Sequence, residues 1–182
     1  MTAARAEGTE AVSALVSRHV REVPDFPQPG VLFRDLTPLF ADGPAFRAVV
    51  DVIVARHGPF DEVAGIEARG FLIAAAVGYA TGAGVVPIRK AGKLPGETLT
   101  VDYALEYGNA TLEVHTDAFT PGARVLLVDD VLATGGTAAA AADLVERAGA
   151  SVVGLSVLME LAGLGGRDAL AGRPVDALLT VR

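Results

Sequence analysis

Two neighbouring carboxylates and a turn of small residues lie together in the stretch V-L-L-V-D-D-V-L-A-T-G-G-T, residues 125–137. The four apolar residues 125–128 are typical of a short strand that is buried on both faces. Asp129 and Asp130 follow directly, so we expect them where this strand leaves an open α/β sheet, the edge at which ligands usually bind. Carboxylates at such an edge can accept hydrogen bonds from sugar hydroxyls or hold a hydrated magnesium ion.

The turn that follows has the composition of a phosphate-binding loop. Small side chains leave its backbone N–H groups open to a ligand, and two hydroxyls add donors; the residues are Ala133, Thr134, Gly135, Gly136 and Thr137. A helix is expected over residues 138–145, so the positive end of its dipole would face the same ligand. A phosphate site beside groups that bind a diol indicates a sugar phosphate.

Other phosphate-binding motifs are missing from the sequence. There is no G-x-x-x-x-G-K-[ST] motif of nucleoside triphosphatases, and no G-x-G-x-x-G follows the first strand as a dinucleotide site requires. The turn at residues 133–137 also contains no lysine. These features favour a site for one terminal phosphate.

The stretch 125–137 resembles the phosphoribosyl pyrophosphate (PRPP) signature of type I phosphoribosyltransferases. Four more blocks, in matching order, are similar to the adenine phosphoribosyltransferases: F-P-Q-P-G-V-L-F-R-D at 26–35, A-R-G-F at 68–71, R-K-A-G-K-L-P-G at 89–96 and L-E-Y-G at 105–108. The resemblance implies a purine salvage enzyme that joins adenine to PRPP, giving AMP and pyrophosphate. It also implies Mg²⁺ as cofactor and a homodimer.

The resemblance assigns residues to each part of PRPP. Asp129 and Asp130 would hold the ribose hydroxyls, with Mg²⁺ bound nearby through PRPP and water, and residues 133–137 would hold the 5′-phosphate. The pyrophosphate would be held by Glu67, Ala68, Arg69, Gly70, Arg89, Lys90 and Lys93. Arg89 could also act across a dimer interface.

The turn at residues 67–70 has one cation and one departure from the family. The planar guanidinium of Arg69 suits phosphate oxygens, although a surface salt bridge would explain it equally simply. The family often has serine where this chain has Ala68, so one side-chain hydrogen bond is lost while the backbone donors remain. The resemblance also implies a non-proline cis peptide between Glu67 and Ala68.

Glu106 is the residue expected to transfer a proton. Bond formation at C1′ of the ribose passes through an oxocarbenium-like state, and a carboxylate near N7 could exchange a proton with the purine. Glu106 lies in a predicted hairpin with a Gly108-Asn109 turn, beside a mobile loop that carries Lys90 and Lys93. Closure of this lid would desolvate the carboxylate and raise its pKa. Without the resemblance, an exposed strand glutamate would be the preferred interpretation.

The base would be recognised by an N-terminal segment and one distant residue. The resemblance assigns adenine to Val31, Leu32, Phe33, Arg34 and Leu161. Backbone groups of Leu32 and Arg34 would read the base edge, and Phe33 and Leu161 would cover its faces. Three prolines in residues 24–29 would fix this backbone as an extended loop, although Phe33 could instead belong to the core.

These residues need an α/β scaffold to position them. Strands that alternate with helices predict a mostly parallel sheet covered on both faces, as in the type I phosphoribosyltransferase fold. We expect one domain, 1–182, with an N-terminal helix and base-binding hood in 1–35 and a lid loop and hairpin in 90–116. The predicted strands are 62–67, 85–89, 101–107, 110–115, 125–128, 152–159 and 175–181, and the predicted helices are 9–23, 70–80, 138–145 and 167–170, with another beginning at Pro44.

Composition excludes several classes of protein. The 182 residues are 51% apolar and carry a net charge of -7, which disfavours a general nucleic-acid surface. There is no cysteine, hence no disulfide or thiolate site. The uncharged residues 70–88 contain several glycines and a proline, which favours a buried helix and strand over a membrane span. Charges interrupt the N-terminus early, so a cytoplasmic protein is expected.

Three alternatives remain open from the sequence. A phosphoribosyltransferase for 6-oxopurines or xanthine would share the signature but not the block at 26–35. A purine-sensing regulator would share the fold without catalysis, but it needs a basic DNA-binding module that the residues before Pro24 do not resemble. A Rossmann-type methyltransferase would explain an acid and glycines after a strand, but not Arg69, Lys93 or residues 134–137.

Overall fold

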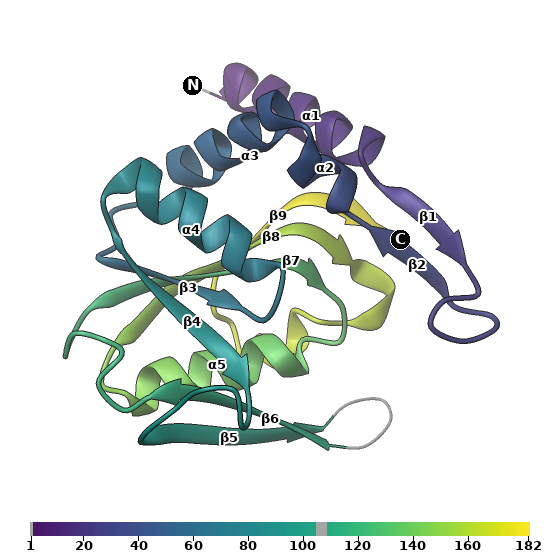
Figure 1. The fold of residues 1–182 in the computed structure, drawn as a ribbon. Coiled ribbons are helices and arrows are strands. Elements are labelled where there is room, and N and C mark those ends of the chain that lie inside the picture. Colours follow the sequence, from purple (N-terminus) through teal and green to yellow (C-terminus); the bar gives the residue numbers. More distant parts are fainter. Residues whose placement is uncertain (1, 105–108) are drawn as a thin grey trace.

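A seven-stranded sheet forms the centre of the protein, whose computed structural model describes residues 2–104 and 109–182, with side chains for 10–103 and 109–182. The strand order is β5-β6-β4-β3-β7-β8-β9 (Figure 1). The five strands from β4 to β9 in this order run parallel, and β6 and β5 extend the sheet antiparallel. The strands are β3 (Glu62–Ile66), β4 (Gly84–Lys90), β5 (Thr98–Ala104), β6 (Asn109–His115), β7 (Arg124–Leu132), β8 (Ser151–Leu161) and β9 (Val175–Val181). The predicted mostly parallel sheet is confirmed.

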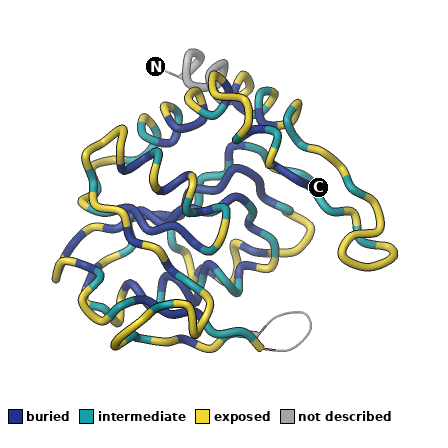
Figure 2. Tube along the Cα trace, in the orientation of Figure 1, coloured by how far each residue is buried: buried dark blue, intermediate teal, exposed yellow. Residues whose placement is uncertain are grey.

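Helices cover both faces of this sheet. One face packs against α5 (Gly136–Arg147), and the other packs against α1 (Thr2–Arg18), α3 (Gly43–Arg56) and α4 (Gly70–Thr81), with the short α2 (Thr37–Ala41) beside them (Figure 1). Burial follows this layering, since the dark-blue buried segments run along the inner strands and the inward sides of the helices (Figure 2). Among the described residues, none of the helices has the length and hydrophobicity needed to cross a bilayer.

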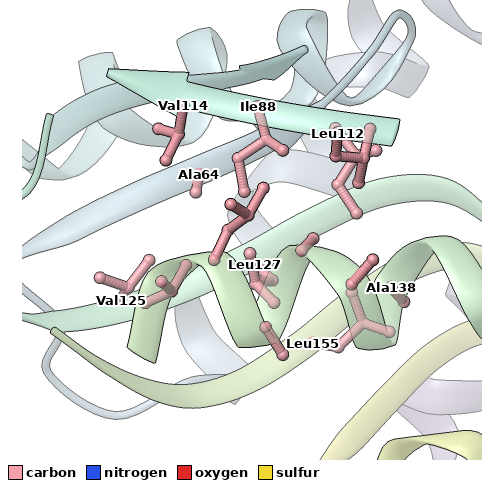
Figure 3. Close-up of a cluster of buried hydrophobic side chains, with 14 of the residues drawn as sticks. Ala64, Ile88, Leu112, Val114, Val125, Leu127, Ala138 and Leu155 are labelled. Atoms are coloured by element: carbon pink, nitrogen blue, oxygen red, sulfur yellow. The ribbon is translucent and has the colours of Figure 1, made fainter. Parts of the chain in front are cut away.

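The central strand β7 shows why the apolar run at residues 125–128 is continuous. Val125 and Leu127 point into the cluster under α5, whereas Leu126 and Val128 point into the cluster under the other helices. All four are at most 1% exposed. Figure 3 shows Val125 and Leu127 meeting residues of β3, β4, β6 and α5 on the first side. A strand covered on both faces has no polar side, which is what the sequence predicts.

The N-terminal segment differs from the prediction. The helix expected over residues 9–23 ends at Arg18, and β1 (Arg21–Pro24) then pairs antiparallel with β2 (Leu32–Asp35). The buried carboxylate of Asp35 accepts hydrogen bonds from Arg21 and from the amide of Thr37. The Thr37 amide, and with it Arg21, lowers the pKa of Asp35 to about 2 despite burial. Pairing with a distant partner therefore overrides the helical spacing of the apolar residues.

The lid hairpin also differs in detail. β5 begins at Thr98 rather than at residue 101, and β6 begins at Asn109, which pairs with Ala104. Asn109 therefore belongs to the ladder and not to the turn predicted at Gly108-Asn109, and Gly108 lies outside the described residues. A hydrogen bond of 2.5 Å from Thr111 to the opposite Asp102 agrees with this register.

Two glycines let α4 lie close to the sheet. A Cβ at Gly65 in β3 would lie 2.8 Å from the Cβ of Ala74, and a Cβ at Gly70 would lie 2.7 Å from the carbonyl oxygen of Val128. Both distances are shorter than a real Cβ atom keeps from other heavy atoms. The turn between β3 and α4 therefore depends on missing side chains to reach β7.

We expect Gly65→Ala to lower the free energy of unfolding by about 1–3 kcal/mol, because the added methyl group overpacks the contact with Ala74. The matched control is Gly58→Ala, since a Cβ there meets no atom within 4 Å. Denaturant unfolding of both variants and the parent checks this. Equal stability of the two variants would show that α4 moves away at no cost.

Candidate active site

Several of the predicted site residues lie at or just after the ends of β3, β7 and β8. Strand β7 is longer than predicted, because its pairing with β8 continues through Leu132, whereas its pairing with β3 stops at Val128. Asp129 and Asp130 were expected where the strand leaves the sheet. That prediction is wrong in detail: they lie within β7, beyond the end of β3, because the long strand β8 supplies pairing partners there.

The two aspartates have different surroundings. The carboxylate of Asp130 is 6% exposed and lies 2.5 Å from Nε of Arg69. Asp129 accepts a hydrogen bond of 2.8 Å from the amide of Asp130, and a Cβ at Gly70 would lie 3.2 Å from its Oδ1. Burial, and secondly the charge of Asp130, raise the pKa of Asp129 well above its usual value. The pair therefore suits ligands that supply positive charge or hydroxyl donors.

The small-residue turn forms a pocket of about 90 Å³ at the start of α5, lined chiefly by Asp129, Val131, Ala133, Thr134, Gly135 and Thr137. Gly135 has φ +84° and comes directly before the first helical residue. The first turn of a helix leaves N–H groups without partners inside the helix. The loop thus has the geometry of an anion site, and the binding of a phosphate by residues 133–137 stays a prediction.

The turn from β3 to α4 places Arg69 between two parts of the protein. The predicted cis peptide between Glu67 and Ala68 is confirmed. The guanidinium of Arg69 contacts Asp130 of β7 and also lies 5.7 Å from the ring centre of Phe33 in β2. Arg69 therefore joins the carboxylate pair to the N-terminal hairpin.

Charged residues of β4 connect this turn to the next loop. Glu67 accepts a hydrogen bond from the amide of Lys90 and lies 3.4 Å from Nε of Arg89. Arg89 in turn donates to the carbonyl oxygen of Lys93. The side chains of Lys90 and Lys93 are exposed. These contacts thus link four of the residues predicted for pyrophosphate, namely Glu67, Arg89, Lys90 and Lys93.

Sequence reasoning missed Glu113. Its side chain is buried in β6, and one oxygen accepts hydrogen bonds of 2.7 Å from the amides of Lys93 and Leu94. Burial raises its pKa, but the amides of residues 94, 93 and 92 outweigh this and lower it overall. The loop expected to be mobile is therefore tied to β6. The available signal was a glutamate inside the apolar strand L-E-V.

The residues predicted for adenine lie in β2, directly before it, and at the end of β8. The half-buried Phe33 packs edge-to-face against Phe26, with ring centres 5.1 Å apart. Val31 and Leu32 follow a tight connection with a cis Phe26-Pro27 peptide, rather than the predicted extended loop, and Arg34 lies in β2. Leu161 ends β8.

Two predictions remain, the catalytic role of Glu106 and the binding of a metal ion near the aspartates. Glu106, with the whole L-E-Y-G block, lies outside the described residues. Within the described residues, no cluster of three or more His, Cys, Asp or Glu side chains forms a protein-only metal site. Any ion near Asp129 and Asp130 would therefore need ligands from a substrate or water.

Known proteins are similar to this chain over nearly its full length. The phosphoribosyl transferase domain matches residues 49–173. The adenine phosphoribosyltransferase of Salinispora tropica is 63% identical, with 99% of this chain and 97% of the relative covered. The corresponding protein of Clavibacter michiganensis is 64% identical, with 93% and 97% covered.

Solved structures agree with the sequence relatives. The adenine phosphoribosyltransferase of Thermoanaerobacter pseudethanolicus has a TM-score of 0.87 at 45% identity, covering 91% of this chain and 98% of the other. The Saccharomyces cerevisiae enzyme, in complex with an imino-altritol bisphosphate and adenine, has a TM-score of 0.89 at 38% identity, covering 93% and 99%. The chain belongs to the phosphoribosyltransferase family and, within it, to the adenine phosphoribosyltransferases.

Proposed function

We propose that the protein transfers the 5-phosphoribosyl group from PRPP to adenine, giving AMP and pyrophosphate in purine salvage. The observation that carries this proposal is the contact of Arg69 with both Asp130 and Phe33, which brings the sugar-phosphate side and the base side of the site together. Family membership supports the same reaction. Family membership does not favour the three alternatives, which are a phosphoribosyltransferase for 6-oxopurines or xanthine, a purine-sensing regulator and a methyltransferase.

The phosphate loop, residues 133–137, would hold the 5′-phosphate without a lysine or arginine of its own. Backbone amides of residues 133–137 at the start of α5 would bind the 5′-phosphate, and the hydroxyls of Thr134 and Thr137 would add donors. Asp129 and Asp130 would accept hydrogen bonds from the ribose hydroxyls. This fixes C1′ relative to the sheet, which is a large part of what catalysis of a two-substrate reaction needs.

The pyrophosphate would leave on the side of the turn at residues 67–70. Arg69, Lys90 and Lys93 supply positive charge there, and backbone donors of the turn add hydrogen bonds. Charge that develops on a leaving group is stabilised best by groups that are already in position. Glu113 supports such positioning, since it holds the backbone of Lys93.

We propose Mg²⁺ as the cofactor of this reaction. Asp129 and Asp130 alone cannot supply the six ligands of an octahedral Mg²⁺ site. The ion would therefore be bound mainly through PRPP oxygens and water. The ion would neutralise charge on the pyrophosphate.

PRPP and AMP are phosphorylated metabolites, so we propose that the protein works in the cytoplasm.

The base would bind at the free edge of β2. Within the described residues, β2 pairs only with β1, in a two-stranded sheet. The opposite edge of Leu32 and Arg34 is thus available to read the pattern of donors and acceptors on adenine. Phe33 and Leu161 would cover the faces of the ring, with Val31 beside them.

The reaction is tested with purified protein, PRPP, Mg²⁺ and one purine base at a time. We expect AMP and pyrophosphate from adenine and no nucleotide from hypoxanthine, guanine or xanthine, because a backbone pattern that fits a 6-amino group leaves polar groups unpaired with a 6-oxo group. Chromatographic detection of nucleotides checks this. Turnover of a 6-oxopurine alone, or of no base, would contradict the proposal.

Glu106 remains the residue proposed for proton transfer to the base. We expect Glu106→Gln to lower kcat by about 10²–10⁴-fold, the usual contribution of general acid–base catalysis, with much less effect on PRPP binding. Glu97→Gln is the control, since Glu97 is an exposed glutamate of the same lid segment. Steady-state kinetics and PRPP titration measure both variants, and unchanged turnover of Glu106→Gln would exclude this role.

We also propose a homodimer formed through α4. This helix has no charged residue, and its outer side exposes Leu72 by 51% and Tyr79 by 93%. A groove between α3 and α4 continues this surface, lined by Gly43, Phe46, Val50, Ala76, Tyr79 and Ala80 together with the charged Arg47 and Asp51. A helix that is apolar on all sides is usually buried, and a second copy of the chain would bury it. Arg89, near the end of β4, is the residue proposed to act across this interface.

We expect the parent protein to sediment at twice the chain mass and Tyr79→Asp to shift it toward the monomer, because a carboxylate would be buried without a partner. Leu164→Asp is the control, since Leu164 is 46% exposed on the connection after β8. Analytical ultracentrifugation distinguishes the variants. A parent protein that is monomeric at micromolar concentration would refute the dimer.

A further inference from the structure

Arg167 forms a two-pronged ion pair with a buried carboxylate. Its Nε lies 2.7 Å from Oε1 of Glu160, its Nη2 lies 2.8 Å from Oε2, and its Nη1 donates to the carbonyl oxygen of Val175. Glu160 is only 5% exposed. The hydrogen bonds from Arg167 lower the pKa of Glu160 despite burial, so the carboxylate stays charged. Such paired contacts hold a guanidinium in one orientation.

This ion pair fixes a connection that has little regular structure of its own. Between β8 and β9 the chain forms only two short 3₁₀ turns, Ala162–Leu164 and Asp168–Leu170. Gly166 and Arg167 lie between these turns. The position of Gly166 therefore depends on anchors such as the neighbouring Arg167 and the buried Leu170.

The connection packs directly against the phosphate loop. A Cβ at Gly135 would collide with the carbonyl oxygen of Gly166 and lie 2.8 Å from the Cβ of Ala169. In the opposite direction, a Cβ at Gly166 would collide with the carbonyl oxygen of Ala133 and lie 2.9 Å from Leu132. Two backbones thus touch without side chains between them. A displacement of Gly166 would be passed straight to residues 133–135.

We propose that Arg167 is a positioning residue: through Glu160 it holds Gly166 against residues 133–135 and so keeps the amides of the phosphate loop aimed at the 5′-phosphate. The inference rests on the proposed function, because it takes PRPP as the ligand of that loop. Arg167 itself would not touch the substrate. Its effect follows from the tight tolerance of a preorganised site, where displacements of about 0.5 Å matter.

The adenine side of the site has separate support. Leu161 directly follows Glu160, but it pairs with Val181 in the ladder between β8 and β9. Backbone pairing therefore keeps Leu161 in place when the ion pair is lost. The inference thus requires a selective effect on PRPP rather than a general loss of both substrates.

The chain contains a matched control in Arg173. It also makes a two-pronged ion pair, with Glu146, and it lies in the same connection before β9. Its Nη1 donates to the carbonyl oxygen of Leu170, much as Nη1 of Arg167 donates to that of Val175, so the two arginines differ chiefly in the carboxylate that they pair with. Glu146 is in the last turn of α5, whereas the phosphate loop precedes its first turn. A helix of this length spans about 18 Å, so the second ion pair is remote from the loop.

The experiment compares Arg167→Gln, Arg173→Gln and the parent protein in AMP formation. We expect Arg167→Gln to raise KM for PRPP by about tenfold to a hundredfold, the range in which small misplacements act, with little change in KM for adenine. Arg173→Gln should leave both values near those of the parent. Arg167→Lys should recover only part of the loss, since an ammonium group cannot make the paired contact.

Two further measurements keep the test valid if Arg167→Gln is unstable or if the parent protein proves inactive. Arg167→Gln leaves Glu160 buried without its partner, so the double variant Glu160→Gln, Arg167→Gln restores neutrality and should show the same selective rise in KM for PRPP. Hydrogen exchange of the ligand-free proteins should be faster over residues 131–139 in Arg167→Gln than in the parent or Arg173→Gln.

The outcomes separate the two claims. Absence of AMP formation by the parent protein would refute the proposed function, while hydrogen exchange would still test whether Arg167 positions the loop. Both arginine variants could instead lose thermal stability with unchanged KM for PRPP and unchanged exchange over residues 131–139. The ion pair would then be merely structural, and the inference would be overturned.

Discussion

The close approach of the turn after β3 to strand β7 is the constraint on which the site depends. Gly65 and Gly70 have no side chains, so α4 starts directly against β7. Only from there can Arg69 reach Asp130, and only then can its guanidinium also lie over Phe33. One packing distance therefore sets the separation between the carboxylates and the N-terminal hairpin, which the reaction needs to be constant.

Much of the scaffold could be predicted because its signals are local. The apolar run before Asp129 marks a strand buried on two faces, and β9 spans the predicted residues. Pro44 lies in the first turn of α3, whose N-cap is Asp42. The turn at residues 133–137 is likewise recognisable from the sequence, since the glycines, the threonine hydroxyls and the following helix are adjacent in the chain. Such segments specify most of their conformation locally, and distant packing, such as that of Gly166 against residues 133–135, then fixes their exact position.

The remaining features depend on partners far apart in the chain. Val20 and Val23 fit a helical stripe, but Arg21 and Asp35 join two strands there instead. Glu113 holds a loop about twenty residues earlier through backbone amides, which every residue type except proline offers, so the contact leaves little trace in the sequence of that loop. The aspartates lie within β7 because β8 is long, which no pattern near Asp129 reveals.

The acidic composition explains why the anion site is built from short-range contacts. With a net charge of -7, the protein as a whole repels a polyanion such as PRPP. Binding must then come from amides at the start of α5 and from cations a few ångströms away, where distance outweighs net charge. These contacts are strong only if the loops that bear them are held in register. Buried carboxylates that accept hydrogen bonds from neighbouring loops, Glu113 from amides and Glu160 from Arg167, provide that register, which is why acidic side chains surround a site for an acidic substrate.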